Sequence, residues 1–168
     1  GWQPFDATRK EEYGFGRYRN VITTLQMERM LNASGPTKGE VVRPSTSEIA
    51  KSIGFLQCVG SRDATVGNLY CSRVCCMASL KNAQLVKEKY PDTDITIYYI
   101  DIRACGEGYE EFYVRAQKLG INFVRARVSR IEEVEGEIFL IFEDTQTGEL
   151  KRVKHDLAVL SVGLEPDS

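Results

Sequence analysis

Two hydrophobic patterns alternate along the second half of the chain. Short apolar runs bounded by turn residues are typical of buried strands, whereas apolar positions three and four residues apart are typical of helices. Strands are expected at 53–59, 94–101, 121–129, 137–143, 149–154 and 156–162, and helices at about 71–89 and 108–119. The polar stretch Glu143–Gly148 predicts an antiparallel hairpin. Strand, helix and strand in succession predict a parallel sheet with helices on its faces.

The first 48 residues have a different pattern. They open with turn formers and aromatic residues, and a helical pattern then runs from Val21 to about Ala33, with Asn20 as a candidate N-cap. Residues 35–48 are rich in proline, glycine, serine and threonine, which is typical of a linker. We therefore expect two parts: residues 1–48, with one helix and the linker, and residues 49–168, with the sheet.

Four of the five cysteines lie in one window, at Cys58, Cys71, Cys75 and Cys76, with the spacing C-x12-C-x3-C-C. Cys58 lies near the end of a predicted strand, and Cys71 and Cys75 share one face of the predicted helix because they are four residues apart. The polar loop between strand and helix can bring the sulfur atoms together at the strand end, where α/β sheets usually place ligands. Four thiolates are the full ligand set of an iron–sulfur cubane or a structural zinc ion.

The spacing alone leaves several interpretations of this window open. The cysteines could hold an iron–sulfur cluster or a zinc ion, form a thiol–disulfide pair, or pack as small hydrophobic residues. Zinc sites usually contain paired C-x2-C knuckles, which are absent from this window. The pattern therefore favours an iron–sulfur cluster without excluding the other three interpretations.

Two stretches around the cysteines, Phe55–Asp63 and Tyr70–Cys76, resemble the A subunit of heterodisulfide reductase and its relatives, which are flavoproteins of anaerobic archaea and bacteria. The similarity continues through Tyr18–Thr24, Leu31–Thr37, Ile100–Ala104 and Gly108–Tyr113. In that family the corresponding cysteines ligate a [4Fe–4S] cluster. The resemblance thus implies that this cluster is held by Cys58, Cys71, Cys75 and Cys76.

The order of elements also resembles the pyridine-nucleotide domain of thioredoxin-reductase-like flavoproteins. There, the domain is inserted into a flavin-binding domain through two crossing strands, which Gly1–Phe5 and Ser161–Pro166 resemble. The resemblance implies a Rossmann-like parallel sheet with helices on both faces plus an antiparallel hairpin. It also implies that the chain is cut at both crossings, that residues 1–48 lie near the flavin domain, and that FAD binds mostly outside this chain.

The turn after the first predicted strand differs from a nucleotide-binding turn. A nicotinamide site needs G-x-G-x-x-G so that the backbone can approach a pyrophosphate. This chain instead has Cys58-Val59-Gly60-Ser61-Arg62-Asp63 at that place. We infer that a metal site replaces the nucleotide site.

Composition and charge limit the partners. The net charge of −2 and the pI near 5.6 give no basic field for nucleic acid. No apolar run approaches the roughly 20 residues that span a bilayer, and the absence of a signal sequence favours the cytoplasm.

The family resemblance implies an electron-transfer module of an oxidoreductase that acts on sulfur groups. Its cluster would pass electrons between the flavin and further clusters toward disulfide reduction, and the fragment alone would be inactive. The implied partners are other heterodisulfide reductase subunits and electron-donor proteins, and a homo-oligomer is left open. Two alternatives are an NAD(P)H-binding domain of a disulfide-reductase-like flavoenzyme and a zinc-stabilised interaction scaffold.

Other reactive side chains have simpler interpretations. Cys105 is expected to be a free thiol, because four ligands already satisfy a cubane. His155, the single histidine, is expected to be exposed or satisfied by neighbours. Asp101 is expected to be a turn carboxylate paired with Arg103. No residue is assigned to acid–base catalysis.

Overall fold

The structure is a computed structural model that describes residues 2–59, 75–99, 109–144, 146–162 and 164–166 of the 168-residue chain. Its centre is a five-stranded sheet in the order β2-β9-β3-β4-β5, and every neighbouring pair of strands in it is parallel. The strands are β2 (Val21–Thr23), β9 (Leu157–Val162), β3 (Ser52–Val59), β4 (Asp94–Tyr99) and β5 (Asn122–Arg125). The predicted parallel sheet is therefore confirmed.

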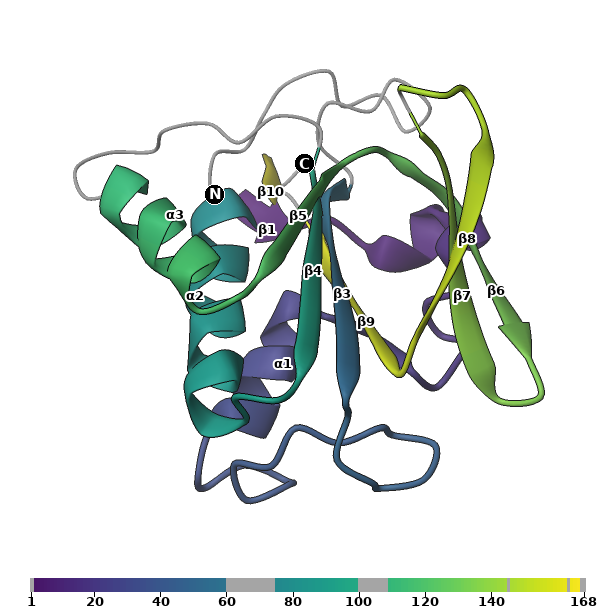
Figure 1. The fold of residues 1–168 in the computed structure, drawn as a ribbon. Helices are drawn as coiled ribbons and strands as arrows, with labels where there is room; N and C mark the ends of the chain where they lie inside the picture. Colours follow the sequence, from purple (N-terminus) through teal and green to yellow (C-terminus); the bar gives the residue numbers. More distant parts are fainter. Residues whose placement is uncertain (1, 60–74, 100–108, 145, 163, 167–168) are drawn as a thin grey trace.

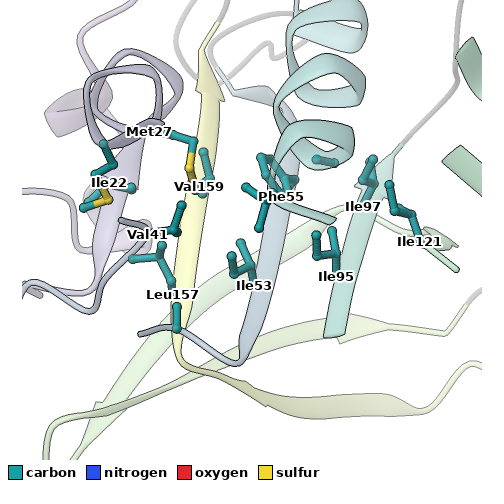
Figure 2. Close-up of a cluster of buried hydrophobic side chains, with 14 of the residues drawn as sticks. Ile22, Met27, Val41, Ile53, Phe55, Ile95, Ile97, Ile121, Leu157 and Val159 are labelled. Carbon is teal, nitrogen blue, oxygen red and sulfur yellow. The ribbon is translucent and has the colours of Figure 1, made fainter. Parts of the chain in front are cut away.

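Three α-helices lie together on one face of this sheet (Figure 1). They are α1 (Thr24–Leu31), α2 (Cys75–Lys89) and α3 (Tyr109–Lys118). Apolar side chains of neighbouring strands form rows between the sheet and the helices, such as Leu157, Ile53 and Ile95 (Figure 2). Full burial of one such side chain contributes about 1.5–3 kcal/mol to folding.

The other face of the parallel sheet is covered by an antiparallel sheet in the order β6-β7-β8 (Figure 1). Its strands are β6 (Val128–Val134), β7 (Glu137–Glu143) and β8 (Leu150–His155). The predicted hairpin is confirmed as the β7–β8 pair, whose turn is closed by a hydrogen bond from the Asp144 N–H to the Glu149 carbonyl. The Rossmann-like class is confirmed, although among the described residues this antiparallel sheet, rather than helices, covers the second face.

The predicted helix from Val21 to Ala33 is wrong at its start. Residues Val21–Thr23 form β2, which pairs in parallel with β9, and helix α1 begins only at Thr24. The partner strand comes late in the chain, so local periodicity carried no sign of the pairing. Asn20 does not cap the helix: its side chain is buried and bonds to Ser45.

The single strand expected at 121–129 is divided between two sheets. β5 ends at Arg125, and β6 begins at Val128 in the antiparallel sheet. At the break, the Ala126 N–H donates to the Tyr99 carbonyl at the end of β4. The segment reads as one strand in the sequence because both of its halves contribute apolar side chains to buried clusters.

The two segments that resemble interdomain crossings pair with each other. β1 (Trp2–Pro4) and β10 (Leu164–Pro166) form an antiparallel ribbon. Between β1 and β2 lie two short 3₁₀-helices, η1 (Ala7–Arg9) and η2 (Glu11–Tyr13). Although β2 shares the main sheet with later strands, the division at residue 48 stays a prediction. No helix in the described part of the chain is long and apolar enough to cross a membrane.

Candidate metal centre

The two elements that carry the cysteine window meet at one edge of the parallel sheet. Cys58 is the second-last residue of β3, and α2 begins with Cys75 and Cys76. Because α2 runs back along the sheet before β4 begins, its first turn lies at the edge where β3 ends (Figure 1). The structure describes the backbone of these cysteines but not their side chains. Cys71 lies outside the described residues, so the convergence of the sulfur atoms stays a prediction.

β3 contains a β-bulge at its cysteine-bearing end. Leu56 pairs with Leu160 and Val59 pairs with Val162, so two residues of β3, Gln57 and Cys58, lie opposite one residue of β9. As a result, Leu56 and Val59 both pack into the cluster that faces the antiparallel sheet. Bulges redirect side chains and are over-represented next to active sites.

The residue of β9 opposite the bulge is Ser161, and it is tied to helix α2. The Ser161 and Ser79 hydroxyl groups form a hydrogen bond, and both residues are completely buried. Ser79 lies one turn after Cys75 on α2. The bond therefore links the start of the cysteine-bearing helix to the strand beside Cys58.

Thiolate chemistry suits this edge of the sheet. The first turn of α2, Cys75-Cys76-Met77-Ala78, contains no acidic residue, and the exposed N–H groups of a helix N-terminus stabilise negative charge. Iron–sulfur clusters and zinc both bind thiolates. The donor set present at the strand end and the helix start thus fits a cluster held by cysteine sulfur.

His155 lies away from this edge and is satisfied, which confirms one of the two expectations for it. The residue is 1% exposed, and its Nδ1 and Nε2 atoms lie 2.8 Å from the Ser52 Oγ and Tyr98 hydroxyl oxygen atoms respectively. Burial, opposed by the carboxylates of Asp94 and Asp156, lowers the pKa of His155 to about 4. The imidazole is therefore neutral at pH 7.

The remaining candidates fall outside what the structure describes. Asp101, Arg103 and Cys105 all lie in the segment 100–108, so their roles stay predictions. The Ser79–Ser161 bond has no counterpart among the sequence predictions. No local signal could have revealed it, because the two serines are 82 residues apart.

Several known proteins similar to this chain are A subunits of heterodisulfide reductases, although no family model matches it. It is 60% identical over 167 residues to the A subunit of the ferredoxin/F420H2-dependent CoB-CoM heterodisulfide reductase of Methanosarcina acetivorans, covering 99% of this chain and 21% of that protein. It is 53% identical over 169 residues to the iron-sulfur A subunit of the CoB–CoM heterodisulfide reductase of Methanocaldococcus jannaschii, covering 99% of this chain and 26% of that protein. The chain thus spans about a fifth to a quarter of these relatives.

Solved structures with a similar fold have much lower sequence identity to this chain. Thioredoxin reductase of T. acidophilum aligns with a TM-score of 0.55 at 14% identity, covering 99% of this chain and 43% of that one. L-lysine 6-monooxygenase of Pseudomonas syringae aligns with a TM-score of 0.55 at 9% identity, covering 89% and 41%. These similarities concern the fold alone. The sequence comparisons confirm the resemblance predicted from the cysteine window: this chain matches one segment of the A subunit of heterodisulfide reductase.

Proposed function

We propose that Cys58, Cys71, Cys75 and Cys76 ligate a [4Fe–4S] cluster that relays electrons in a FAD-dependent oxidoreductase of the heterodisulfide reductase type. The observation that carries this proposal is the position of cysteines on both the end of β3 and the start of α2, at one edge of the sheet. The Methanocaldococcus relative is named an iron-sulfur subunit, which supports an iron–sulfur cluster as the group that these cysteines bind.

The chemistry divides between the cluster and the protein. A bound cluster supplies one-electron transfer, and the protein sets its potential through charge, hydrogen bonds and solvent access. The first turn of α2 contributes a partial positive charge, which favours the electron-rich thiolates. The buried Leu56 and Val59 beside the bulge exclude water from the sheet behind Cys58.

The proposed activity is that of the larger protein. Disulfide reduction, the FAD that exchanges electrons with the cluster, and the neighbouring reductase subunits and electron-donor proteins all belong to this proposal. A cytoplasmic location and a homo-oligomeric state stay predictions. The division of the chain into residues 1–48 and residues 49–168 also stays a prediction.

The decisive experiment measures iron, acid-labile sulfide and zinc in protein purified without oxygen. The variant Cys58→Ser/Cys75→Ser is expected to lose about four irons and four sulfides per chain relative to wild type. Cys105→Ser is the matched control, because Cys105 lies outside the proposed ligand set, and it is expected to retain full iron content.

Other outcomes would favour other functions. Loss of one zinc per chain in the double variant would favour the zinc-stabilised scaffold. Unchanged metal content in the double variant would refute any metal centre in this window. In that case, saturable fluorescence quenching by NAD(P)H would favour the nucleotide-binding alternative.

A further inference from the structure

The Ser79–Ser161 pair is a buried polar contact between α2 and β9. Both residues are 0% exposed, and each hydroxyl group has the other as a hydrogen-bond partner. Ser79 is followed on α2 by Leu80 and Ala83, which pack in the helix-side cluster. A buried hydroxyl is costly unless it is hydrogen-bonded, so this pair constrains how α2 can sit on β9.

The position of the pair relates it to the cysteines from both sides. Ser161 is the one residue of β9 that lies opposite the Gln57–Cys58 bulge. Ser79 follows Cys75 by one helical turn on α2. The hydrogen bond therefore joins α2, which bears Cys75 and Cys76, to β9, the strand that pairs with the Cys58-bearing end of β3.

A hydrogen bond constrains this junction in a way that apolar packing does not. Hydrophobic contacts are non-directional and tolerate small sliding of a helix on a sheet. A hydroxyl–hydroxyl bond requires a donor–acceptor distance near 2.7–2.8 Å and a favourable angle. The ligands of a metal centre must lie within about half an ångström of their required positions. The donor–acceptor distance of a hydroxyl–hydroxyl bond varies over a similarly narrow range.

We infer that Ser79 and Ser161 are positioning residues for the proposed metal centre: their bond ties α2 to β9, and the pairing of β9 with β3 then fixes the first turn of α2 relative to the bulged end of β3. This inference rests on the proposed function. The serines are not ligands in it. They act through α2, which carries Cys75 and Cys76, and through β9, which pairs with the strand that carries Cys58.

The test compares Ser79→Ala, Ser161→Ala and the double variant in anaerobically purified protein. Each single variant removes the described hydrogen-bond partner of one buried hydroxyl and is expected to lower the melting temperature. The double variant leaves neither hydroxyl and is expected to recover most of the wild-type melting temperature. If the pair serves folding alone, the double variant should therefore behave like wild type. If the pair positions the cysteines, the metal centre of the double variant should still differ from that of wild type.

The readouts are the electron paramagnetic resonance spectrum of the reduced centre, its midpoint potential, and the rate of iron loss to a chelator. The signal of this centre is the difference between wild type and Cys58→Ser/Cys75→Ser. In Ser79→Ala/Ser161→Ala, we expect a shifted spectrum and a shifted midpoint potential. We also expect iron loss to the chelator several-fold faster than in wild type. Thr24→Val is the matched control: the Thr24 hydroxyl donates to the Leu160 carbonyl of the same strand at 3.2 Å, but from a helix without cysteines.

The outcomes separate this inference from the proposal beneath it. If wild type shows no iron that depends on Cys58 and Cys75, the proposed function fails and the inference fails with it. If wild type holds the cluster and Ser79→Ala/Ser161→Ala keeps the wild-type spectrum, midpoint potential and iron-loss rate, the inference alone is overturned. An equal change of spectrum, potential and iron-loss rate in Thr24→Val would also overturn the inference. The change would then follow from the loss of any side-chain hydrogen bond to β9.

Discussion

At the scale of single residues, the buried imidazole of His155 connects the two sheets. It lies between the Ser52 and Tyr98 hydroxyl groups, and each ring nitrogen has one of them as a partner at 2.8 Å. Burial also raises the pKa of Tyr98 well above its usual range. Both groups are therefore neutral at physiological pH, and the network joins β8 to the parallel sheet without any charge.

Protonation of His155 should destabilise the fold in mildly acidic solution. The ordinary pKa of a histidine is 6.5, whereas the pKa of His155 in the folded protein is about 4, so between these pH values the unfolded chain binds more protons. The free energy of unfolding should fall as the pH decreases from 6.5 to 4, by about 3 kcal/mol at most. Urea unfolding at a series of pH values measures this slope.

The control for this prediction is His155→Gln, which removes the titrating group. The variant should be less stable at pH 7 but should lose less stability than wild type between pH 6.5 and 4. Equal losses in the two proteins would mean that other groups cause the acid sensitivity.

Gly54 allows the imidazole to approach the sheet. A Cβ atom at this position would lie 3.0 Å from His155 Cδ2 and 3.1 Å from Leu140 Cδ2, both in the covering sheet. Gly54→Ala should therefore destabilise the protein by about 1–3 kcal/mol through overpacking, as measured by chemical unfolding. Gly148→Asn is the control, because no atom lies within 4 Å of its Cβ position and asparagine tolerates its positive φ. Equal stability of wild type and Gly54→Ala would contradict the prediction.

At the scale of elements, sequence patterns predicted what is locally encoded. The apolar runs that form β3, β4 and β9 are buried on both faces, which is why they are continuous hydrophobic stretches. The apolar residues of Val21–Thr23 also fit a helical spacing, and the helix predicted there follows from that fit. Pairing with β9, more than 130 residues later, makes the segment a strand, and tertiary pairing of this kind overrides weak local propensity.

The junction between β2 and α1 depends on a side-chain cap. The Thr23 N–H donates to Gln26 Oε1 at 2.9 Å, as in one half of a capping box. Gln26→Ala should therefore lower the free energy of unfolding by about 1 kcal/mol. Glu28→Ala, at an exposed position of the same helix, should change it by less than about 0.5 kcal/mol. Thermal unfolding compares the two variants, and equal effects would argue against the cap.

At the scale of the whole molecule, the hydrophobic pattern was enough to place the elements that carry Cys58 and Cys75. Hydrophobic periodicity predicts that Cys58 lies near the end of the strand at 53–59 and that Cys75 lies in the early part of a helix at about 71–89. Parallel topology then puts both near one edge of the sheet, as the positions of β3 and α2 confirm. The bulge at Gln57 and the bond from Ser79 to Ser161 could not be predicted. Both depend on the pairing of β3 with β9, which joins distant parts of the chain.

A metal or cofactor that binds only the folded chain stabilises the folded state. If a cluster bridges β3 and α2, its removal should release the helix start from the strand end. Removal of iron by a chelator under anaerobic conditions should then lower the melting temperature, by about 2–4 °C for each kcal/mol of lost binding free energy. Amide hydrogen exchange should accelerate first in the early turns of α2, while the buried strand β4 should stay protected.

Cys58→Ser/Cys75→Ser provides the reference state for this experiment. Its melting temperature should already resemble that of the stripped wild type, and the chelator should change it no further, because the centre is never formed. Cys105→Ser should behave like wild type before and after treatment. If stripped and loaded wild type melt at the same temperature, with equal exchange in α2, the cysteines do not join these two elements through a metal. The fold at this edge is then stabilised by the packing and hydrogen bonds of the protein itself.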